Sequence, residues 1–315
     1  MIIVRNILFV SFTIILSFVV GELMVRLKNS TMKNYDIEMW KYSKELKVIS
    51  ENKLLGHEHV SSKCSTLESV EVCLNSNGFR GDELNKIIKD RRILFLGSSI
   101  TLGWGVENSK VMTSLLQNKF NDDDLNVEVI NAGIGNYNTV RYVERFLTKL
   151  KDTNPTDIVV HYFINDAEEL PIGGGNIFLR NSQLAVTGWI AYQRIFNSFK
   201  KGGLSDYYES TYMLDSSGFT KMKESLEKLS KYAKTKGINI YLAMTPDIHF
   251  LKDYPFKNIH ATMKNLSNDF GYKYVDLYPY LEGIEFEKLQ IIPGDAHPNE
   301  YGHELMANAL YEHIK

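Results

Sequence analysis

The 315-residue sequence lacks the features of several common protein classes. Its net charge of −2 offers no basic surface to nucleic acid, and it has no arginine-rich or zinc-binding motif, so we expect no nucleic-acid partner. It has no internal repeats and no low-complexity tract. The glycine run at residues 173–175 is not followed by Lys-Ser/Thr, which excludes a phosphate-binding loop and indicates a hinge. With 44% hydrophobic and 23% charged residues, the chain can bury a sizeable core as one domain with additions.

Long hydrophobic runs are absent except at the amino terminus. Residues 7–20 carry no charge, while Arg5 precedes them and Glu22 and Arg26 follow. A helix extended a few residues beyond this run would span a bilayer with its flanking charges at the interface. We predict that residues 1–28 form an uncleaved signal anchor, with a cleaved signal peptide or a buried core helix as alternatives. The flanking positive charges do not decide its orientation.

Cysteine is scarce, because Cys64 and Cys73 are the only two in the chain. Both lie in residues 29–90, which we interpret as a juxtamembrane segment. A tight hairpin between them would let the two sulfurs meet. A disulfide would indicate an oxidising compartment, and therefore a periplasmic or other extracytoplasmic catalytic domain. Two unpaired buried thiols are the alternative.

The same segment shows two local patterns. Residues 35–46 have the spacing of a short amphipathic helix. Residues 75–82 form a turn cluster at the boundary to the next domain.

From residue 91 onwards, apolar runs of strand length alternate with helical stretches. Strands are predicted at 93–96, 127–131, 157–163, 238–244 and 274–277, and helices at 110–120, 139–150, 224–236, 259–270 and 301–314. This alternation implies right-handed crossovers, a parallel flavodoxin-like sheet and a three-layer α/β/α sandwich. Residues 167–216 interrupt it with little periodicity, and we predict an insertion or lid there that shapes the substrate site.

The first strand of this region leads directly into two serines. Residues 93–96 form an apolar run typical of a buried strand, Gly97 permits a sharp turn, and Ser98 and Ser99 follow. Open α/β sheets bind ligands at the carboxyl ends of their strands. A helix that starts there presents free N–H groups to a developing oxyanion. The alternative interpretation is a serine that only caps the helix.

Four segments, in order, resemble the four sequence blocks of the SGNH (GDSL-type) hydrolases. They are Gly97-Ser98-Ser99-Ile100-Thr101, Asn131-Ala132-Gly133-Ile134-Gly135-Asn136-Tyr137-Asn138-Thr139, Phe163-Ile164-Asn165-Asp166 and Asp295-Ala296-His297-Pro298-Asn299. The resemblance extends over residues 91–315, which we therefore predict to be the catalytic domain. It implies an α/β/α hydrolase that transfers acyl groups through a covalent acyl-serine.

The resemblance assigns a catalytic triad. The nucleophile of the family is the third residue of a Gly-Asp-Ser motif, so Ser99 corresponds to it and Ser98 replaces the usual Asp. A serine needs a base, and the matching histidine is His297. Most of the family places the acid three residues before this histidine, where this chain has Gly294. We predict that Asp295, two residues before, orients His297; the alternative is a Ser-His dyad oriented by a backbone carbonyl.

The resemblance also assigns three donors to the tetrahedral oxyanion. They are the Ser99 backbone N–H, the Asn165 side-chain amide and a backbone N–H that most of the family takes from a glycine. The corresponding residue here is Asn136, which tolerates left-handed conformations, although Gly135 becomes the donor after a shift of one residue. Phe163 stands where the family usually has Gly, which narrows the pocket beside Asn165.

Other polar clusters do not predict a metal site. Asp247 and His249 are too few ligands for one. His57 and His59, taken with the two cysteines, match no standard zinc spacing. We expect neither a metal ion nor a cofactor.

The sequence therefore predicts a serine esterase with an acylated carbohydrate or a small ester as substrate. The resemblance points to O-acetyl or other acyl groups on envelope or extracellular glycans. A glycan O-acyltransferase with the same triad is the first alternative, and an inactive binding module on the same fold is the second. The presence of Ser99, Asn165 and His297 together argues against the inactive module.

Overall fold

The computed structural model describes residues 2–31, 34–87, 89–171, 177–198 and 203–315. By its internal contacts the chain forms two compact units. The smaller comprises Met1–Glu45 and Gly174–Lys201, and the larger comprises Leu46–Gly173 and Gly202–Lys315. The larger unit thus begins at residue 46 and includes most of the segment that the sequence analysis separates as juxtamembrane.

A five-stranded parallel sheet forms the centre of the larger unit, in the order β6-β5-β7-β8-β9. Its strands are β5 (Arg91–Gly97), β6 (Val127–Asn131), β7 (Asp157–Phe163), β8 (Asn239–Thr245) and β9 (Lys273–Asp276). Every residue of β7 is buried, as expected of a central strand covered on both faces. The strand order is that of flavodoxin, which confirms the predicted sheet.

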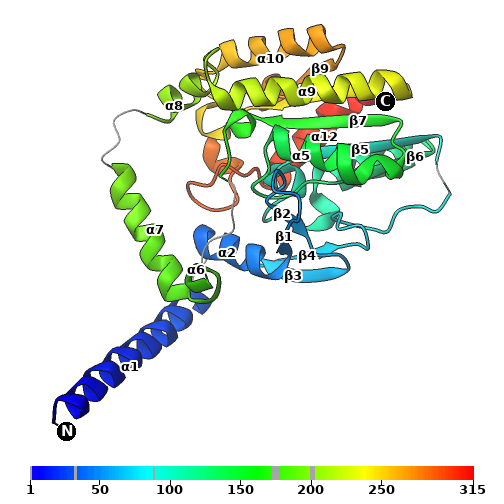
Figure 1. Cartoon of the computed structure of the whole chain (residues 1–315). Helices are drawn as coiled ribbons and strands as arrows, with labels where there is room; N and C mark the ends of the chain where they lie inside the picture. Colours follow the sequence, from blue (N-terminus) through cyan, green and yellow to red (C-terminus); the bar gives the residue numbers. More distant parts are fainter. Residues whose placement is uncertain (1, 32–33, 88, 172–176, 199–202) are drawn as a thin grey trace. The chain divides into compact units, whose positions relative to one another are not determined.

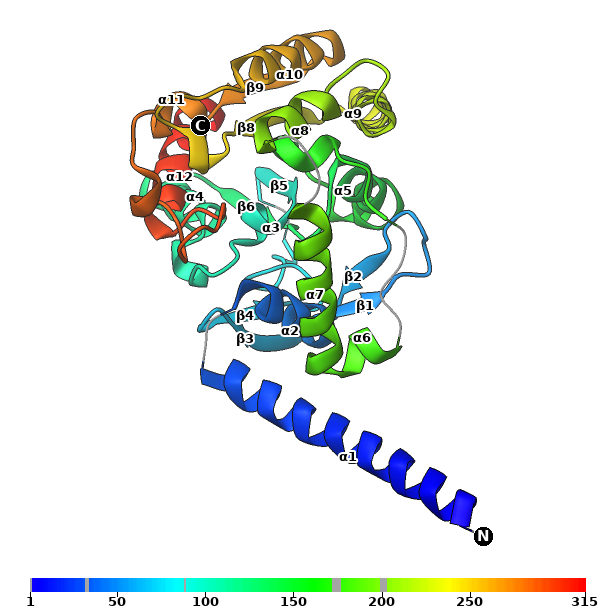
Figure 2. The same ribbon diagram turned by 90° about the vertical axis from the view of Figure 1, so that its left-hand side faces the viewer.

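Helices cover both faces of this sheet (Figure 1). The larger unit contains α3 (Ser99–Leu102), α4 (Met112–Asp122), α5 (Thr139–Arg145), α8 (Leu204–Thr211), α9 (Ser217–Lys236), α10 (Lys257–Phe270), α11 (Tyr278–Leu281) and α12 (Glu300–Ile314). Helix α4 packs against α12, and α5 packs against α9. Figure 2 shows β5 and β6 between these two pairs, as right-handed crossovers require. The three-layer sandwich is confirmed.

The weak periodicity of residues 167–216 gives no indication of helices, yet much of the described part of this segment is helical. This part contains α6 (Ile177–Asn181), α7 (Gln183–Ser198) and α8, while the predicted hinge at 173–175 lies outside the described residues.

Helix α9 begins seven residues before the predicted start at 224. Its Ser216 N-cap accepts a hydrogen bond from the Phe219 N–H, and Gly218 allows close packing, since a Cβ there would lie 2.2 Å from the Ala167 carbonyl oxygen.

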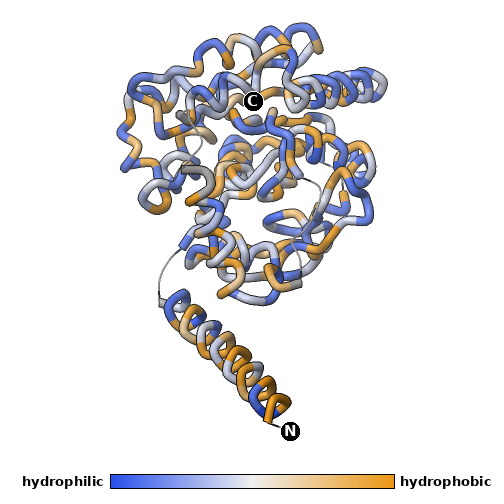
Figure 3. The backbone as a smooth tube through the Cα atoms, turned by 60° about the vertical axis from the view of Figure 1, so that its left-hand side comes forward, coloured by the Kyte–Doolittle hydropathy of each residue, from blue (hydrophilic) through white to orange (hydrophobic). Residues whose placement is uncertain are grey.

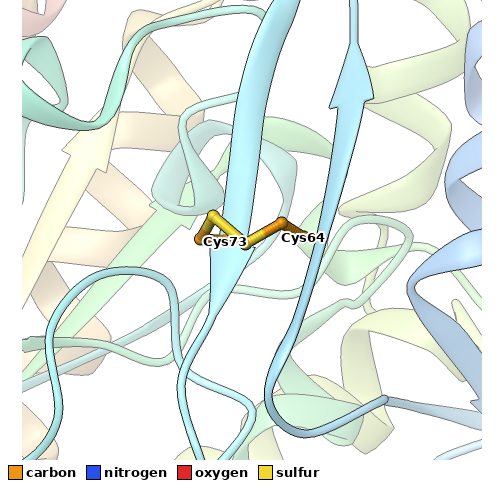
Figure 4. Close-up of a disulfide and its surroundings, with 2 residues drawn as sticks. All are labelled: Cys64 and Cys73. Atoms are coloured by element: carbon orange, nitrogen blue, oxygen red, sulfur yellow. A yellow bond between two sulfur atoms is a disulfide. The ribbon is translucent and has the colours of Figure 1, made fainter.

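Two hairpins precede the sheet in the larger unit. The first pairs β1 (Lys47–Ile49) with β2 (His57–His59), and the second pairs β3 (Lys63–Leu67) with β4 (Val70–Leu74). Cys64 lies directly opposite Cys73 in the second hairpin, and the two form a disulfide (Figure 4). The structure therefore decides between the two alternatives left open by the sequence: the hairpin brings the sulfurs together as a disulfide, and they are neither free thiols nor zinc ligands.

The smaller unit combines α1 (Ile2–Thr31) and α2 (Tyr35–Glu45) with α6 and α7. Helix α1 is predominantly hydrophobic (Figure 3). Residues 2–30 are long and apolar enough to cross a membrane, a test that a signal sequence would also pass, and none of the most apolar window is buried as a core helix would be. Glu22 caps α7 by accepting hydrogen bonds from the Gln183 and Leu184 N–H groups and the Ser182 hydroxyl. Helix α1 is therefore fastened to the start of α7.

Candidate active site

The candidate site lies where the strand order of the sheet reverses. Strands β5 and β7 are neighbours, but the chain leaves their carboxyl ends toward opposite sides of the sheet. Ser99 follows β5, and Asn165 follows β7 in the short 3₁₀ helix η4 (Ile164–Ala167). Such a switch point is the usual ligand crevice of an open α/β sheet.

The turn that presents Ser99 depends on a glycine. A Cβ at Gly97 would lie 1.9 Å from the Thr101 Oγ1 and 2.9 Å from the His161 carbonyl oxygen, so no other residue fits without rearrangement. Thr101 is held in turn by a 2.8 Å hydrogen bond between its hydroxyl and the His161 Nδ1. Burial lowers the pKa of His161 to about 3, so its ring is neutral within the core. Helix α3 then ends at Gly103, whose φ of 80° is left-handed.

Arg80, which the sequence analysis places in a turn cluster, supports this helix. Its guanidinium donates hydrogen bonds to the carbonyl oxygens of Leu102 and Gly103, at 2.7 and 2.5 Å, and to that of Val106. The carbonyls of Leu102 and Gly103 lie at the carboxyl end of α3, where no helical N–H reaches them, so a buried cation satisfies them. Sequence reasoning missed Arg80 because it lies outside every motif block.

The structure brings Ser99, His297 and Asp295 together in a continuous line of hydrogen bonds. The His297 Nε2 lies 2.7 Å from the Ser99 Oγ, and the His297 Nδ1 lies 2.6 Å from the Asp295 Oδ1. With Nδ1–H donating to the carboxylate, Nε2 is left as the acceptor of the serine proton. His297 and Asp295 are each 8% exposed, so little solvent competes with these bonds.

In the loop before α12, a step of two residues is enough for the Asp295 carboxylate to reach the His297 ring. The Asp295 Oδ1 accepts hydrogen bonds from both the backbone N–H and the Nδ1 of His297, so one oxygen fixes the loop and the ring. Asn299 caps α12 by accepting hydrogen bonds from two of its first N–H groups. The buried ring of Trp104 lies 6.4 Å from the His297 ring, centroid to centroid. No motif block predicted this neighbour.

The three assigned oxyanion donors share one property. Among the described residues, neither the backbone N–H groups of Ser99 and Asn136 nor the side-chain amide of Asn165 has a protein acceptor. Asn136 has a φ of 63°, the left-handed conformation that favours glycine or asparagine. Unsatisfied donors around a nucleophile are what an oxyanion needs.

The remaining candidates have structural roles. Asp166 is fully buried and accepts hydrogen bonds from the Tyr142 hydroxyl and the Phe163 N–H, and burial raises its pKa well above the ordinary range. Phe163 itself packs into the hydrophobic core.

Asp247 and His249 form a second Asp-x-His pair. The Asp247 Oδ1 accepts hydrogen bonds from the backbone N–H and the Nδ1 of His249, at 3.0 and 2.7 Å. However, the His249 Nε2 lies 3.4 Å from the Gly294 carbonyl oxygen, and among the described residues no serine hydroxyl is hydrogen-bonded to it. This pair has the local geometry of Asp295 and His297 but a different partner on the far ring nitrogen.

Comparison with known proteins gives matches of two kinds, to solved structures and to a family model. No curated protein sequence matches the chain. Solved structures that resemble it include TesA, at 15% identity and a TM-score of 0.48, with 71% of this chain and 98% of that chain covered. A catalytic mutant of Axe2, an acetylxylan esterase from Geobacillus stearothermophilus, has 17% identity and a TM-score of 0.48, with 73% and 96% covered. The esterase EstA from Pseudoalteromonas sp. has 18% identity and a TM-score of 0.45, with 71% and 97% covered.

The family comparison is more specific than these structural likenesses. The model of the GDSL-like Lipase/Acylhydrolase family matches residues 95–305, which is more than half of the chain. The matched range contains the serine turn, the loop of Asn136, the end of β7 and the histidine loop. The chain belongs to the GDSL-like lipase/acylhydrolase family.

Proposed function

We propose that this ester hydrolase removes O-acetyl or other acyl groups from envelope or extracellular glycans through an acyl-serine intermediate on Ser99. The observation that carries the proposal is the hydrogen-bonded line from Ser99 through His297 to Asp295. A serine hydroxyl is a weak nucleophile until a base removes its proton, and here that base lies within hydrogen-bond distance. The same line argues against an inactive binding module.

The reaction follows from the positions of the protons. As the Ser99 Oγ attacks the ester carbonyl, its proton passes to the His297 Nε2, and Asp295 stabilises the imidazolium through Nδ1–H. The imidazolium then protonates the departing alcohol oxygen, which leaves an acyl-serine. Water attacks this ester with His297 again as base, releases the carboxylic acid and restores Ser99.

The negative oxygen of both tetrahedral intermediates needs donors that are already oriented. We assign this role to the backbone N–H groups of Ser99 and Asn136 and to the Asn165 amide. Their lack of protein acceptors in the described structure supports the assignment. No metal ion or cofactor is required for these steps.

The substrate class follows from where the enzyme would act. The disulfide supports an oxidising compartment, and the apolar α1 supports attachment of the chain to a membrane. We therefore propose an anchored enzyme with an extracytoplasmic, periplasmic catalytic unit. Acylated envelope carbohydrates are among the esters within its reach, and the insertion at 167–216 is our candidate for shaping the site around them.

Turnover and covalent labelling test the function. The full-length protein in detergent is expected to hydrolyse p-nitrophenyl acetate, and a serine-directed fluorophosphonate should abolish this with one label per chain. Mass spectrometry should place the label on the tryptic peptide of residues 93–110, which contains Ser99. Turnover no faster than buffer, or a label elsewhere, would contradict the proposal.

A comparison of substrates tests the glycan class. Faster acetate release from acetylated oligosaccharides than from long-chain lipid esters would support it. Transfer of the acetyl group to an added sugar would favour the acyltransferase.

Thiol labelling tests the compartment. In protein taken from cells into denaturant with a maleimide present, Cys64 and Cys73 should both stay unlabelled until a reductant is added, because a disulfide has no thiol to alkylate. Labelling of both cysteines without reductant would indicate a reducing compartment and contradict an extracytoplasmic catalytic unit.

A further inference from the structure

The carbonyl oxygen of Gly135 accepts hydrogen bonds from a buried lysine and a partly buried histidine. The Lys47 Nζ lies 2.7 Å from this oxygen, and the His57 Nε2 lies 3.0 Å from it. Lys47 and His57 come from the paired strands β1 and β2, before the part of the chain that matches the family model. Burying a lysine is costly, and Lys47 is only 9% exposed, so its position calls for a reason.

The position of this carbonyl suggests the reason. Gly135 C=O and Asn136 N–H belong to one peptide group, which is trans. In a trans peptide the two groups point in opposite directions. Holding the carbonyl from one side therefore aims the Asn136 N–H toward the other side, and this N–H has no acceptor in the described protein.

The rest of the loop is held in a similar way. Arg145 donates a 2.8 Å hydrogen bond to the Ala132 carbonyl oxygen, and Arg141 donates a 2.9 Å bond to that of Asn136. Lys47 and His57, by contrast, hold the peptide group that carries the assigned oxyanion donor. The Tyr137 hydroxyl donates to the His57 carbonyl oxygen at 2.5 Å, which fastens β2 to the same loop.

We infer that Lys47, assisted by His57, is a positioning residue for the oxyanion hole: it orients the Gly135–Asn136 peptide and strengthens its N–H as a donor. This inference rests on the proposed acyl-serine mechanism. A donor on the carbonyl oxygen draws electron density from the peptide and makes its N–H more positive, and low local polarity enhances this effect. The gain appears in the transition state, where the substrate oxygen becomes an anion.

The electrostatics of the pair agree with this arrangement. Burial, with the nearby Lys47 as the second cause, lowers the pKa of His57 to about 3, so its neutral ring donates through Nε2–H. Burial and the neighbouring Arg141 hold the pKa of Lys47 well below its usual range. An amine donates to the carbonyl whether or not it carries the extra proton.

Lys47→Met tests the inference, because it keeps the length of the side chain and removes the donor. We expect kcat per active site to fall about 10- to 100-fold, somewhat less than the loss of a whole oxyanion donor, while KM stays close to that of the wild type. Phenylboronic acid forms a tetrahedral adduct with the serine that carries a negative oxygen, and its inhibition constant should rise by a similar factor. Lys47→Arg, which restores an N–H donor, should recover part of kcat.

Lys149→Met is the matched control. Lys149 is half-exposed and forms a 2.6 Å ion pair with Glu58, between His57 and His59 on β2, so its loss perturbs the same hairpin without touching Gly135. Fluorophosphonate titration of Ser99 counts the folded sites, so rates per titrated site remain meaningful if Lys47→Met is unstable.

The outcomes separate the inference from the proposed function. Wild-type kcat per site and boronate affinity in Lys47→Met would overturn the role of Lys47, while the wild-type enzyme would still depend on Ser99. An equal loss in Lys149→Met would also overturn it, because the effect would then belong to the hairpin. Absence of Ser99-dependent turnover in the wild type would instead refute the proposed function.

Discussion

Ser99→Ala is expected to lower kcat for p-nitrophenyl acetate by about 10⁴- to 10⁶-fold, with a folded protein and little change in melting temperature. The variant removes the oxygen that forms the acyl-enzyme, and the His297 Nε2 loses its partner at 2.7 Å. Stability should be kept because Ser99 is the first residue of α3, and the hydrogen bond of its side chain to His297 serves the site rather than the helix. Residual activity would come from direct attack by water on a bound ester whose carbonyl oxygen occupies the oxyanion hole. The measurement is steady-state kinetics on purified full-length protein, with circular dichroism to confirm folding.

Ser98→Ala is the matched control for this prediction. Ser98 is the adjacent serine, is buried, and makes no side-chain capping hydrogen bond to α3. It occupies the place of the Asp in the family motif, and in the acyl-serine mechanism its hydroxyl has no task. Ser98→Ala should therefore stay close to wild-type activity. If Ser98→Ala lost most of its activity while Ser99→Ala kept it, Ser98 rather than Ser99 would be the nucleophile.

The central fold was predictable because its strands follow simple rules. The segments 127–131 and 157–163 are short apolar runs bounded by turns, and the observed β6 and β7 have the same limits. The start of α9 and the helices within 167–216 were missed because local pattern is a weak guide there. A Ser-Gly pair reads as a turn, yet Gly218 serves close packing against the end of η4. That requirement arises only from the tertiary structure.

The candidate site divides in the same way. The triad residues lie in motif blocks whose order and chemistry are visible along the chain. The sequence alone therefore predicted that Ser99 and His297 act together, although 198 residues separate them. Lys47 and Arg80 have no such signal. They act on backbone carbonyls far away in the sequence, and which carbonyl a long side chain reaches depends on how β1 and the turn after β4 pack. Basic residues before a motif block are usually solvated, so no pattern marks these two.

The second Asp-x-His pair shows what local sequence cannot decide. Asp247 and Asp295 make the same two hydrogen bonds to the histidine two residues later. Only the partner of the far ring nitrogen differs, a serine hydroxyl for His297 and a backbone carbonyl for His249. The function of an Asp-x-His step therefore depends on the β5 turn, which lies almost 200 residues earlier in the chain for His297.

Asp295→Asn is expected to lower kcat by about 10³- to 10⁴-fold, which is less than Ser99→Ala but far more than a change in packing. The amide is nearly the same size as the carboxylate, so the loop should persist. However, it carries no charge to stabilise the imidazolium, and its NH₂ group can hold the ring with the proton on Nε2, where Ser99 needs an acceptor.

Asp247→Asn provides the matched comparison, because it makes the same chemical change in the same local geometry without a serine in reach. Its activity should stay near that of the wild type, while pH–rate profiles and melting curves are measured for both variants. A loss below about 10-fold in Asp295→Asn would contradict the triad and favour a Ser-His dyad oriented by a backbone carbonyl, since such a carbonyl is untouched by the substitution. An equally large loss in Asp247→Asn would mean that the carboxylates support the loops rather than the proton transfer. A large loss confined to Asp295→Asn would show that one carboxylate two residues before the histidine performs the role that most of the family gives to an acid three residues before it.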